Sequence, residues 1–175
     1  LLFAGRLVHE KGVDVLLEAV ALDRAAGGPL ALDLAGSGPL EPLLIDRCRA
    51  LGIQERVRFL GPLGGPALAQ AMRDSAAVVV PSRSEEAFGL TAAEALCTGR
   101  IALVSDRGGL PEVVAGGGLV LPTDDPGAWR DAMVKATLDT AWRHAQEEGL
   151  AGLPARFGLE RHVGAYLDVY RAAVQ

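Results

Sequence analysis

Two charged side chains lie in a short loop bounded by glycines near the start of the chain. Residues 5–12, GRLVHEKG, hold Arg6 and Lys11, and Lys11 is one of only two lysines in the sequence. An arginine fork and a lysine point charge could together neutralise a diphosphate. The alternative is a solvated turn with a surface ion pair, and this loop alone leaves both open.

Two glutamates bracket a glycine further along, in residues 84–96, SEEAFGLTAAEAL. Glu86 precedes a predicted helix start, where free backbone N–H groups suit a phosphate. Helical side chains lean toward the N-terminus, so Glu94 would point back to the same place, and both carboxylates could accept hydrogen bonds from sugar hydroxyls. Alternatively, Glu86 only complements the helix dipole and Glu94 is a surface residue.

Three further glycine-containing loops give weaker signals. AGSGPL, residues 35–40, lets backbone amides approach an anion or a ring, but it lacks the third glycine of the dinucleotide fingerprint. FLGPLGG, residues 59–65, could read the edge of a base through its backbone. SDRGGLPEVV, residues 105–114, offers one more close backbone approach.

Short apolar segments alternate with helical patterns and would position these loops. Strands are predicted at residues 1–4, 30–35, 57–60, 76–80, 101–105 and 119–121, and helices at 13–26, 40–51, 67–73, 90–97 and 110–114. This order predicts an α/β fold, a doubly wound Rossmann-like parallel sheet of about six strands with helices on both faces. All five loops then follow strands, where such sheets bind ligands. Beyond residue 122 the chain is predicted to be helical. It ends in an amphipathic helix whose apolar stripe is formed by Leu159, Val163, Tyr166, Leu167, Tyr170 and Val174.

Composition excludes several classes of protein. The 175 residues are half hydrophobic, which indicates a globular domain, and no apolar run is long enough to span a bilayer. The net charge of −5 argues against nucleic-acid binding. Cys48 and Cys97 lack metal-ligand spacing and are expected to be buried thiols in a reducing compartment. The first residues already resemble a strand, so we expect residues 1–175 to be one domain of a larger polypeptide.

The five loops in this order, followed by FGLERHVGAYLDVYR, resemble a known family across essentially the whole chain. The chain is similar to the C-terminal, donor-binding domain of retaining GT-B glycosyltransferases of the glycogen-synthase-like superfamily, the glycosyl transferases group 1. The spacing of Glu86 and Glu94 around FGL is the most specific element, and the GR…KG loop comes next.

The resemblance implies a role for each matching residue. Arg6, Lys11 and Glu86 would be catalytic, with the two cations holding the leaving diphosphate and Glu86 binding donor-sugar hydroxyls. Glu94 would bind the ribose. The other donor-binding residues would be Gly5, Gly36, Gly38, Phe59, Leu60, Gly61, Leu63, Phe88, Gly89 and Leu90.

The resemblance also implies partners. The ligand would be a nucleoside diphosphate sugar, with no metal and no further cofactor, and the N-terminal acceptor domain of the same polypeptide would be missing. We expect the isolated chain to bind its donor weakly without transferring it, and its last helix to form a homodimer or to move. A cytoplasmic location is expected, with peripheral membrane association only for the parent protein.

Two alternatives to a glycosyltransferase stay open at this point. The first is a non-catalytic nucleotide-sugar-binding or regulatory module of the same fold. The second, a nicotinamide dehydrogenase, is disfavoured by the missing dinucleotide fingerprint.

Overall fold

A single parallel sheet forms the centre of the computed structural model, which describes residues 1–152, 155 and 157–173. Its strands lie in the order β3-β2-β1-β4-β5-β6, and every neighbouring pair is parallel. Their bounds are β1 Leu2–Ala4, β2 Leu32–Ala35, β3 Val57–Gly61, β4 Val78–Val80, β5 Ala102–Ser105 and β6 Gly118–Leu121. The predicted six-stranded, doubly wound Rossmann-like sheet is confirmed.

The order in which strands are added to the sheet reverses at its middle, between β1 and β4. β1 and β4 are neighbours, so the first half of the chain winds outward from β1 and the second half winds outward from β4. All residues of β4 and β5 are buried, as expected for short apolar strands covered on both faces. Loops that leave β1 and β4 at their carboxyl ends are therefore brought side by side.

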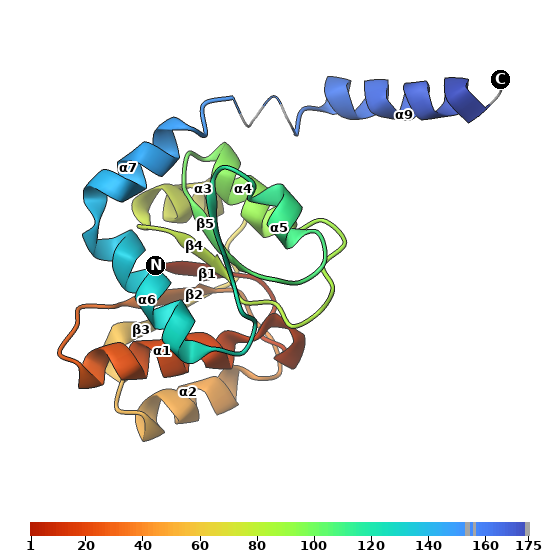
Figure 1. Ribbon diagram of the computed structural model, residues 1–175. Helices are drawn as coiled ribbons and strands as arrows, with labels where there is room; N and C mark the ends of the chain where they lie inside the picture. The colour runs from red at the N-terminus through yellow and green to blue at the C-terminus, as the bar shows by residue number, and fades with distance from the viewer. Residues whose placement is uncertain (153–154, 156, 174–175) are drawn as a thin grey trace.

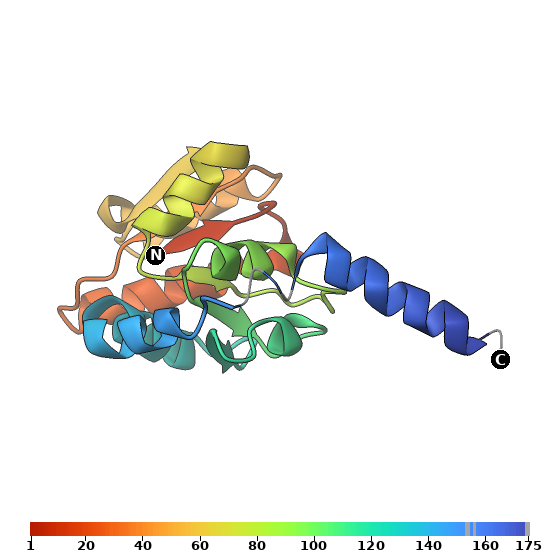
Figure 2. The ribbon, with the colours of Figure 1, turned by 90° about the horizontal axis from the view of Figure 1, so that it is seen from above.

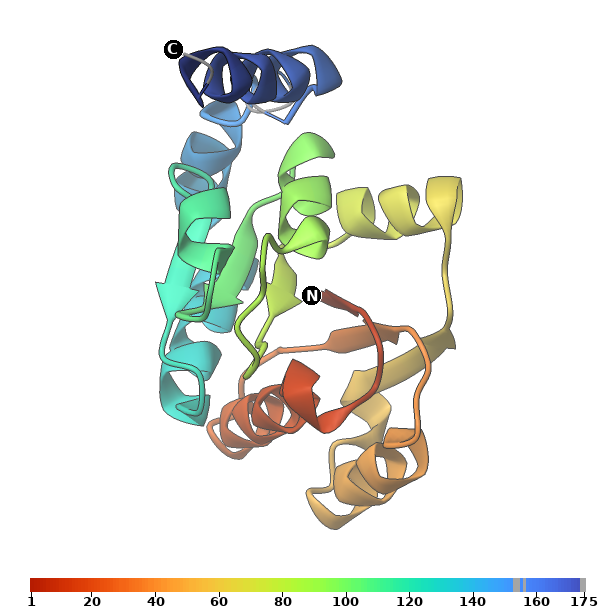
Figure 3. The same ribbon diagram turned by 90° about the vertical axis from the view of Figure 1, so that its right-hand side faces the viewer.

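Helices cover both faces of the sheet (Figure 1; Figure 3). One face carries α1 (Val13–Ala25), α2 (Glu41–Ala50) and α6 (Pro126–Leu138). The other carries α3 (Gly65–Asp74), α4 (Leu90–Cys97) and α5 (Leu110–Val113). Two short 3-10 turns, η1 (His9–Lys11) and η2 (Gln54–Arg56), precede α1 and β3. The fully buried Trp129 packs α6 into the core, and its indole N–H donates to the Pro122 carbonyl over 2.9 Å.

Two details differ from the sequence-based expectation. The helical region after residue 122 is interrupted, because Asp139 caps a new helix, α7 (Thr140–Glu148), by accepting a hydrogen bond from the Trp142 N–H. The expectation that both thiols are buried is wrong for Cys97, which is exposed because it lies at the outer end of α4. Cys48 is buried as expected.

The last helix, α9 (Leu159–Ala173), extends away from the sheet (Figure 2). Several of its large apolar side chains are exposed, namely Val163, Tyr166, Leu167, Val169 and Tyr170. The predicted stripe also included Val174, which lies outside the described residues, and Leu159, whose side chain is not described. Within the described ranges, no helix combines the length and the apolar character needed to cross a membrane.

Candidate functional site

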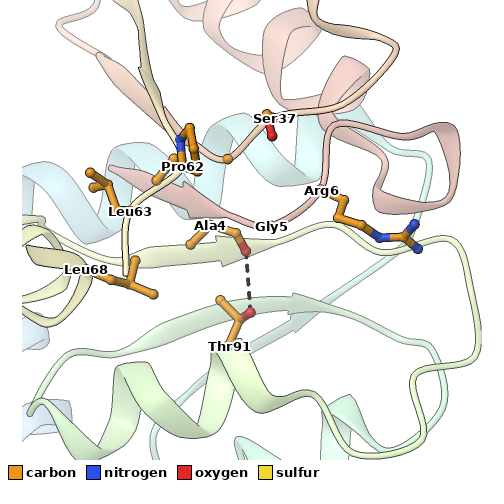
Figure 4. Close-up of a pocket in the computed structure, with 10 residues that line it drawn as sticks. Ala4, Gly5, Arg6, Ser37, Pro62, Leu63, Leu68 and Thr91 are labelled. Carbon is orange, nitrogen blue, oxygen red and sulfur yellow. Dashed lines mark hydrogen bonds between the residues drawn. The ribbon is translucent and has the colours of Figure 1, made fainter. Parts of the chain in front are cut away.

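Two adjoining cavities open at the carboxyl ends of the central strands. The first, of about 320 Å³, is lined by Ala4, Gly5, Arg6, Ala35, Gly36, Ser37, Pro62, Leu63, Leu68 and Thr91 (Figure 4). The second, of about 350 Å³, is lined by Phe3, Ala4, Gly5, Lys11, Val80, Glu86, Ala87, Phe88, Gly89, Leu90 and Thr91. Because Ala4, Gly5 and Thr91 line both, the two cavities lie next to each other across β1 and β4.

The first cavity combines an apolar wall with backbone polar groups. Leu63 and Leu68 line one side, and the Thr91 hydroxyl donates to the Ala4 carbonyl over 3.4 Å (Figure 4). The ends of β1 and β2 can approach closely because residue 36 is a glycine. Any side chain there would collide with the Gly5 carbonyl. An apolar wall next to the backbone of Gly5 and Gly36 suits a planar ring that carries polar groups at its edge.

The second cavity is dominated by an ion pair between Lys11 and Glu86. The Ser82 hydroxyl donates a second hydrogen bond to the same carboxylate over 2.6 Å. Burial alone would raise the pKa of Glu86, but the hydrogen bonds from Lys11 and Ser82 and the Lys11 charge lower the pKa below its ordinary value. The site thus holds a fixed carboxylate beside a fixed ammonium.

The start of α4 faces this ion pair. Gly89 precedes the helix with a φ of +89°, which favours glycine, and a side chain there would collide with Leu110. The N–H groups in the first turn of a helix have no intrahelical acceptor, so this end can donate hydrogen bonds to an anion. The loop before it is held by the Gly109 N–H, which donates to the Glu86 carbonyl over 2.7 Å.

Arg6 and Glu94 lie at the margin of the site. The Arg6 side chain extends away from Leu63 and Leu68 (Figure 4), and within the described part of the chain it has no hydrogen bond or ion pair. Glu94 is exposed and lies one turn after Thr91 on α4, so it shares a helix face with a residue that lines both cavities. Arg6 therefore lines the edge of the first cavity, whereas Glu94 lines neither cavity.

Besides Glu94, four further predicted residues do not line the two cavities. Phe59 packs against the core, and Leu60 lines a separate hollow on another part of the molecule. The Gly61 carbonyl accepts a hydrogen bond from the Gly36 N–H over 2.8 Å. Gly38 lies against the backbone of Leu7, with no room for a side chain. From residues 59–63, only Pro62 and Leu63 reach the first cavity.

Sequence reasoning did not single out four residues that contribute to the site. Ser37, Leu68 and Thr91 line the first cavity, and Ser82 holds Glu86. Ser37 and Thr91 lie within motifs that the sequence analysis quoted, so their position after a strand was a usable signal. Leu68 gave no such signal, because an apolar helical residue normally indicates core packing.

Comparison with known proteins identifies the family. Residues 1–149 match the family described as Glycosyl transferases group 1. The chain is a member of the glycosyl transferases group 1 family. This family member is 38% identical to a D-inositol 3-phosphate glycosyltransferase of Saccharomonospora viridis, over 99% of this chain and 43% of that protein. The chain therefore spans less than half the length of that curated relative.

Solved structures support the fold of this glycosyl transferases group 1 domain. Sucrose-phosphate synthase from Thermosynechococcus elongatus is 28% identical with a TM-score of 0.82, covering 99% of this chain and 45% of the other. HepE from Anabaena, solved in complex with UDP and glucose, has a TM-score of 0.84 at 22% identity, covering 96% and 47%. The fold matches the C-terminal, donor-binding domain of GT-B glycosyltransferases, as the sequence predicted.

Proposed function

We propose that this chain is the donor-binding half of a retaining glycosyltransferase, which transfers a hexosyl group from a nucleoside diphosphate sugar to an acceptor. The observation that carries the proposal is the cavity in which Lys11, Glu86 and the start of α4 meet. Family membership and the UDP complex of HepE support a nucleotide-sugar ligand. Retention is carried over from the family resemblance.

The two cavities fit the two ends of such a donor. The apolar first cavity would take the base and ribose, with Glu94 at its margin to accept hydrogen bonds from ribose hydroxyls. The second would take the diphosphate and the sugar, with Lys11 and the α4 N–H groups on the phosphates and Glu86 on sugar hydroxyls. Arg6, at the margin of the first cavity and without an internal partner among the described residues, can turn toward the diphosphate.

The chemistry follows from this placement. When the bond between the anomeric carbon and the diphosphate oxygen breaks, its electron pair stays on that oxygen, while the sugar becomes positive. The acceptor hydroxyl then forms the new bond at the anomeric carbon and gives its proton to the departing diphosphate. Arg6, Lys11 and the helix end would stabilise the negative charge on the diphosphate, and Glu86 would face the positive sugar.

The acceptor side of the reaction belongs to the rest of the parent protein. We propose that the parent carries an N-terminal domain which binds the acceptor and closes over the donor, so that the isolated chain binds without transferring. The second candidate function is a binding or regulatory module without catalysis. Both candidates predict the same nucleotide binding, so only an activity measurement on the parent protein separates them.

Titration calorimetry of the chain with UDP, GDP, ADP and their hexose derivatives tests the binding site. We expect one nucleoside diphosphate to bind, and Arg6→Ala and Lys11→Ala each to weaken it about 10-fold, since each removes a charge-assisted contact. The melting temperature should hardly change for Arg6→Ala, because its side chain is exposed.

Arg58→Ala provides the control for loss of a positive charge. Arg58 is exposed and paired with Asp33 on β2, outside both cavities, so its removal should leave the affinity unchanged. The proposal fails if none of the nucleotides binds, or if Arg6→Ala and Lys11→Ala bind them as well as the wild-type chain does.

A further inference from the structure

We infer that Arg83 is a positioning residue, which fixes the place of Lys11 in the donor site without touching the donor. The inference rests on the proposed function, because it assigns Lys11 to the diphosphate. Arg83 lies in the loop after β4, three residues before Glu86. The described lining of the two cavities does not include it.

The Arg83 side chain joins three elements that are distant in sequence. Its Nη1 and Nη2 atoms donate to the two carboxylate oxygens of Asp14, in the first turn of α1, over 2.7 and 2.8 Å. Its Nε atom donates to Asp124, in the loop before α6, over 2.7 Å. Nη1 also lies 3.3 Å from the His9 carbonyl of η1. The Arg83 side chain is only 20% exposed, and its guanidinium donors point at acceptors within the protein, so it stabilises the fold.

The backbone around Arg83 holds the Lys11 loop as well. The Glu10 carbonyl accepts hydrogen bonds from the Arg83 N–H over 2.8 Å and from the Ser84 N–H over 3.4 Å. On the other side of Lys11, Gly12 has a φ of +64° and lies so close to the Pro81 carbonyl that a side chain would collide with it. Both neighbours of Lys11 are therefore fixed against the loop that carries Arg83.

This arrangement explains how one loop can place both charges of the site. Glu86 belongs to the β4–α4 loop itself, while Lys11 belongs to η1 and reaches Glu86 across the β1–β4 junction. Arg83 connects the two by anchoring η1 and α1 to the β4–α4 loop. Loss of the Arg83 fork should thus let Lys11 move relative to Glu86 and to α4, which weakens contacts that depend on geometry.

The composition of the chain allows a direct measurement of Lys11. The sequence has two lysines, and Lys135 lies 4.6 Å from the centre of the Trp142 ring, which shifts its resonances and so identifies them. In a chain labelled with ¹³C at lysine Cε, we expect Arg83→Met to shift or broaden the Lys11 signal while the Lys135 signal stays in place. This readout needs no nucleotide, so it is independent of the proposed function.

Binding measurements complete the test. We expect Arg83→Met to weaken the nucleoside diphosphate about 10-fold, and Arg83→Lys to recover part of that loss, since lysine can pair with only one carboxylate at a time. In a Lys11→Ala background, Arg83→Met should change the affinity less than about 2-fold, because Arg83 acts through Lys11. Arg58→Met removes a comparable bidentate contact, in which Arg58 donates two hydrogen bonds of 2.6 Å to Asp33. This control should change neither the Lys11 signal nor the affinity for the nucleotide.

Each outcome bears on the inference. An unchanged Lys11 signal in Arg83→Met, or fully additive effects of Arg83→Met and Lys11→Ala on affinity, would overturn it. If Arg83→Met does not fold, Asp14→Asn and Asp124→Asn weaken the same contacts from the other side and should shift the Lys11 signal. If Lys11 shifts as expected but no nucleotide binds the wild-type chain, the proposed function fails while the placement of Lys11 by Arg83 stands.

Discussion

At the scale of single residues, the Glu86 carboxylate is held in place by two hydrogen-bond donors. Lys11 and Ser82 both donate to the same oxygen of its carboxylate, although they come from different loops. The carboxylate is therefore oriented before any ligand contact is made, and its charge is stabilised by the fold. A carboxylate that is already oriented loses little conformational entropy when it binds a hydroxyl, and its fixed position favours hydroxyls in one geometry.

The lowered pKa of Glu86 predicts how stability depends on pH. The unfolded chain takes up a proton on this group more readily than the folded chain does, so the stabilisation is present above the unfolded pKa, about 4.3. It is lost as pH falls through the lower folded pKa. We expect the free energy of unfolding to fall more steeply below about pH 5 in the wild type than in Glu86→Gln.

Urea titrations at a series of pH values measure this difference. Glu148→Gln, on the exposed surface of α7, is the control and should keep the wild-type slope. A slope in Glu86→Gln equal to that of the wild type would mean that the ion pair with Lys11 contributes nothing to the folded state.

At the scale of elements, the sequence predicted those features whose determining residues are adjacent in the chain. α4 has the predicted bounds, Leu90–Cys97, because its glycine start and its apolar run are adjacent in the chain. The end of α6 was missed because Asp139 sits within a pattern that looks helical on both sides. Arg83 gave no signal, since its partners Asp14 and Asp124 are 69 and 41 residues away. Pairings over such distances depend on the topology of the sheet rather than on neighbouring residues.

The β4–α4 and β5–α5 loops approach each other closely at Gly108, whose N–H donates to the Glu85 carboxylate over 2.7 Å. Gly108 has a φ of +54°, and a side chain there would collide with the backbone of Glu86. We predict that Gly108→Ala lowers the free energy of unfolding by about 2–4 kcal/mol, from the strained φ and the collision together, and weakens nucleotide binding.

Gly116→Ala separates these two causes. Gly116 has a φ of +87° but open space around it, so the substitution carries the backbone strain without the collision. Chemical denaturation should show a loss of only about 1 kcal/mol for it, with unchanged affinity. Equal losses of stability in the two variants would show that the close approach to Glu86 is unimportant.

At the scale of the whole molecule, α9 stands apart from the rest. Its apolar side chains are exposed, although the Phe157 ring before it packs edge-on against Phe88 at 5.8 Å. We predict that removing residues 158–175 changes the free energy of unfolding by less than about 1 kcal/mol, because little apolar surface is lost from the core. Urea denaturation of the shortened chain measures this, and a marked drop would show that α9 packs on its own sheet.

Self-association is the second consequence of that exposed face. The homodimer through the last helix stays a prediction, and sedimentation velocity of the complete and the shortened chain tests it. Association that depends on concentration and disappears with α9 would support it.

The adjacency of β1 and β4 also suggests how the molecule could be divided. Residues 75–77 connect α3 to β4 at the end of the sheet opposite the two cavities. Cutting there would put Arg6 and Lys11 on one fragment and Glu86 and Glu94 on the other. Reassembly of the two fragments should then be promoted by a ligand that contacts both of them. The divided domain would thus act as a sensor for that ligand.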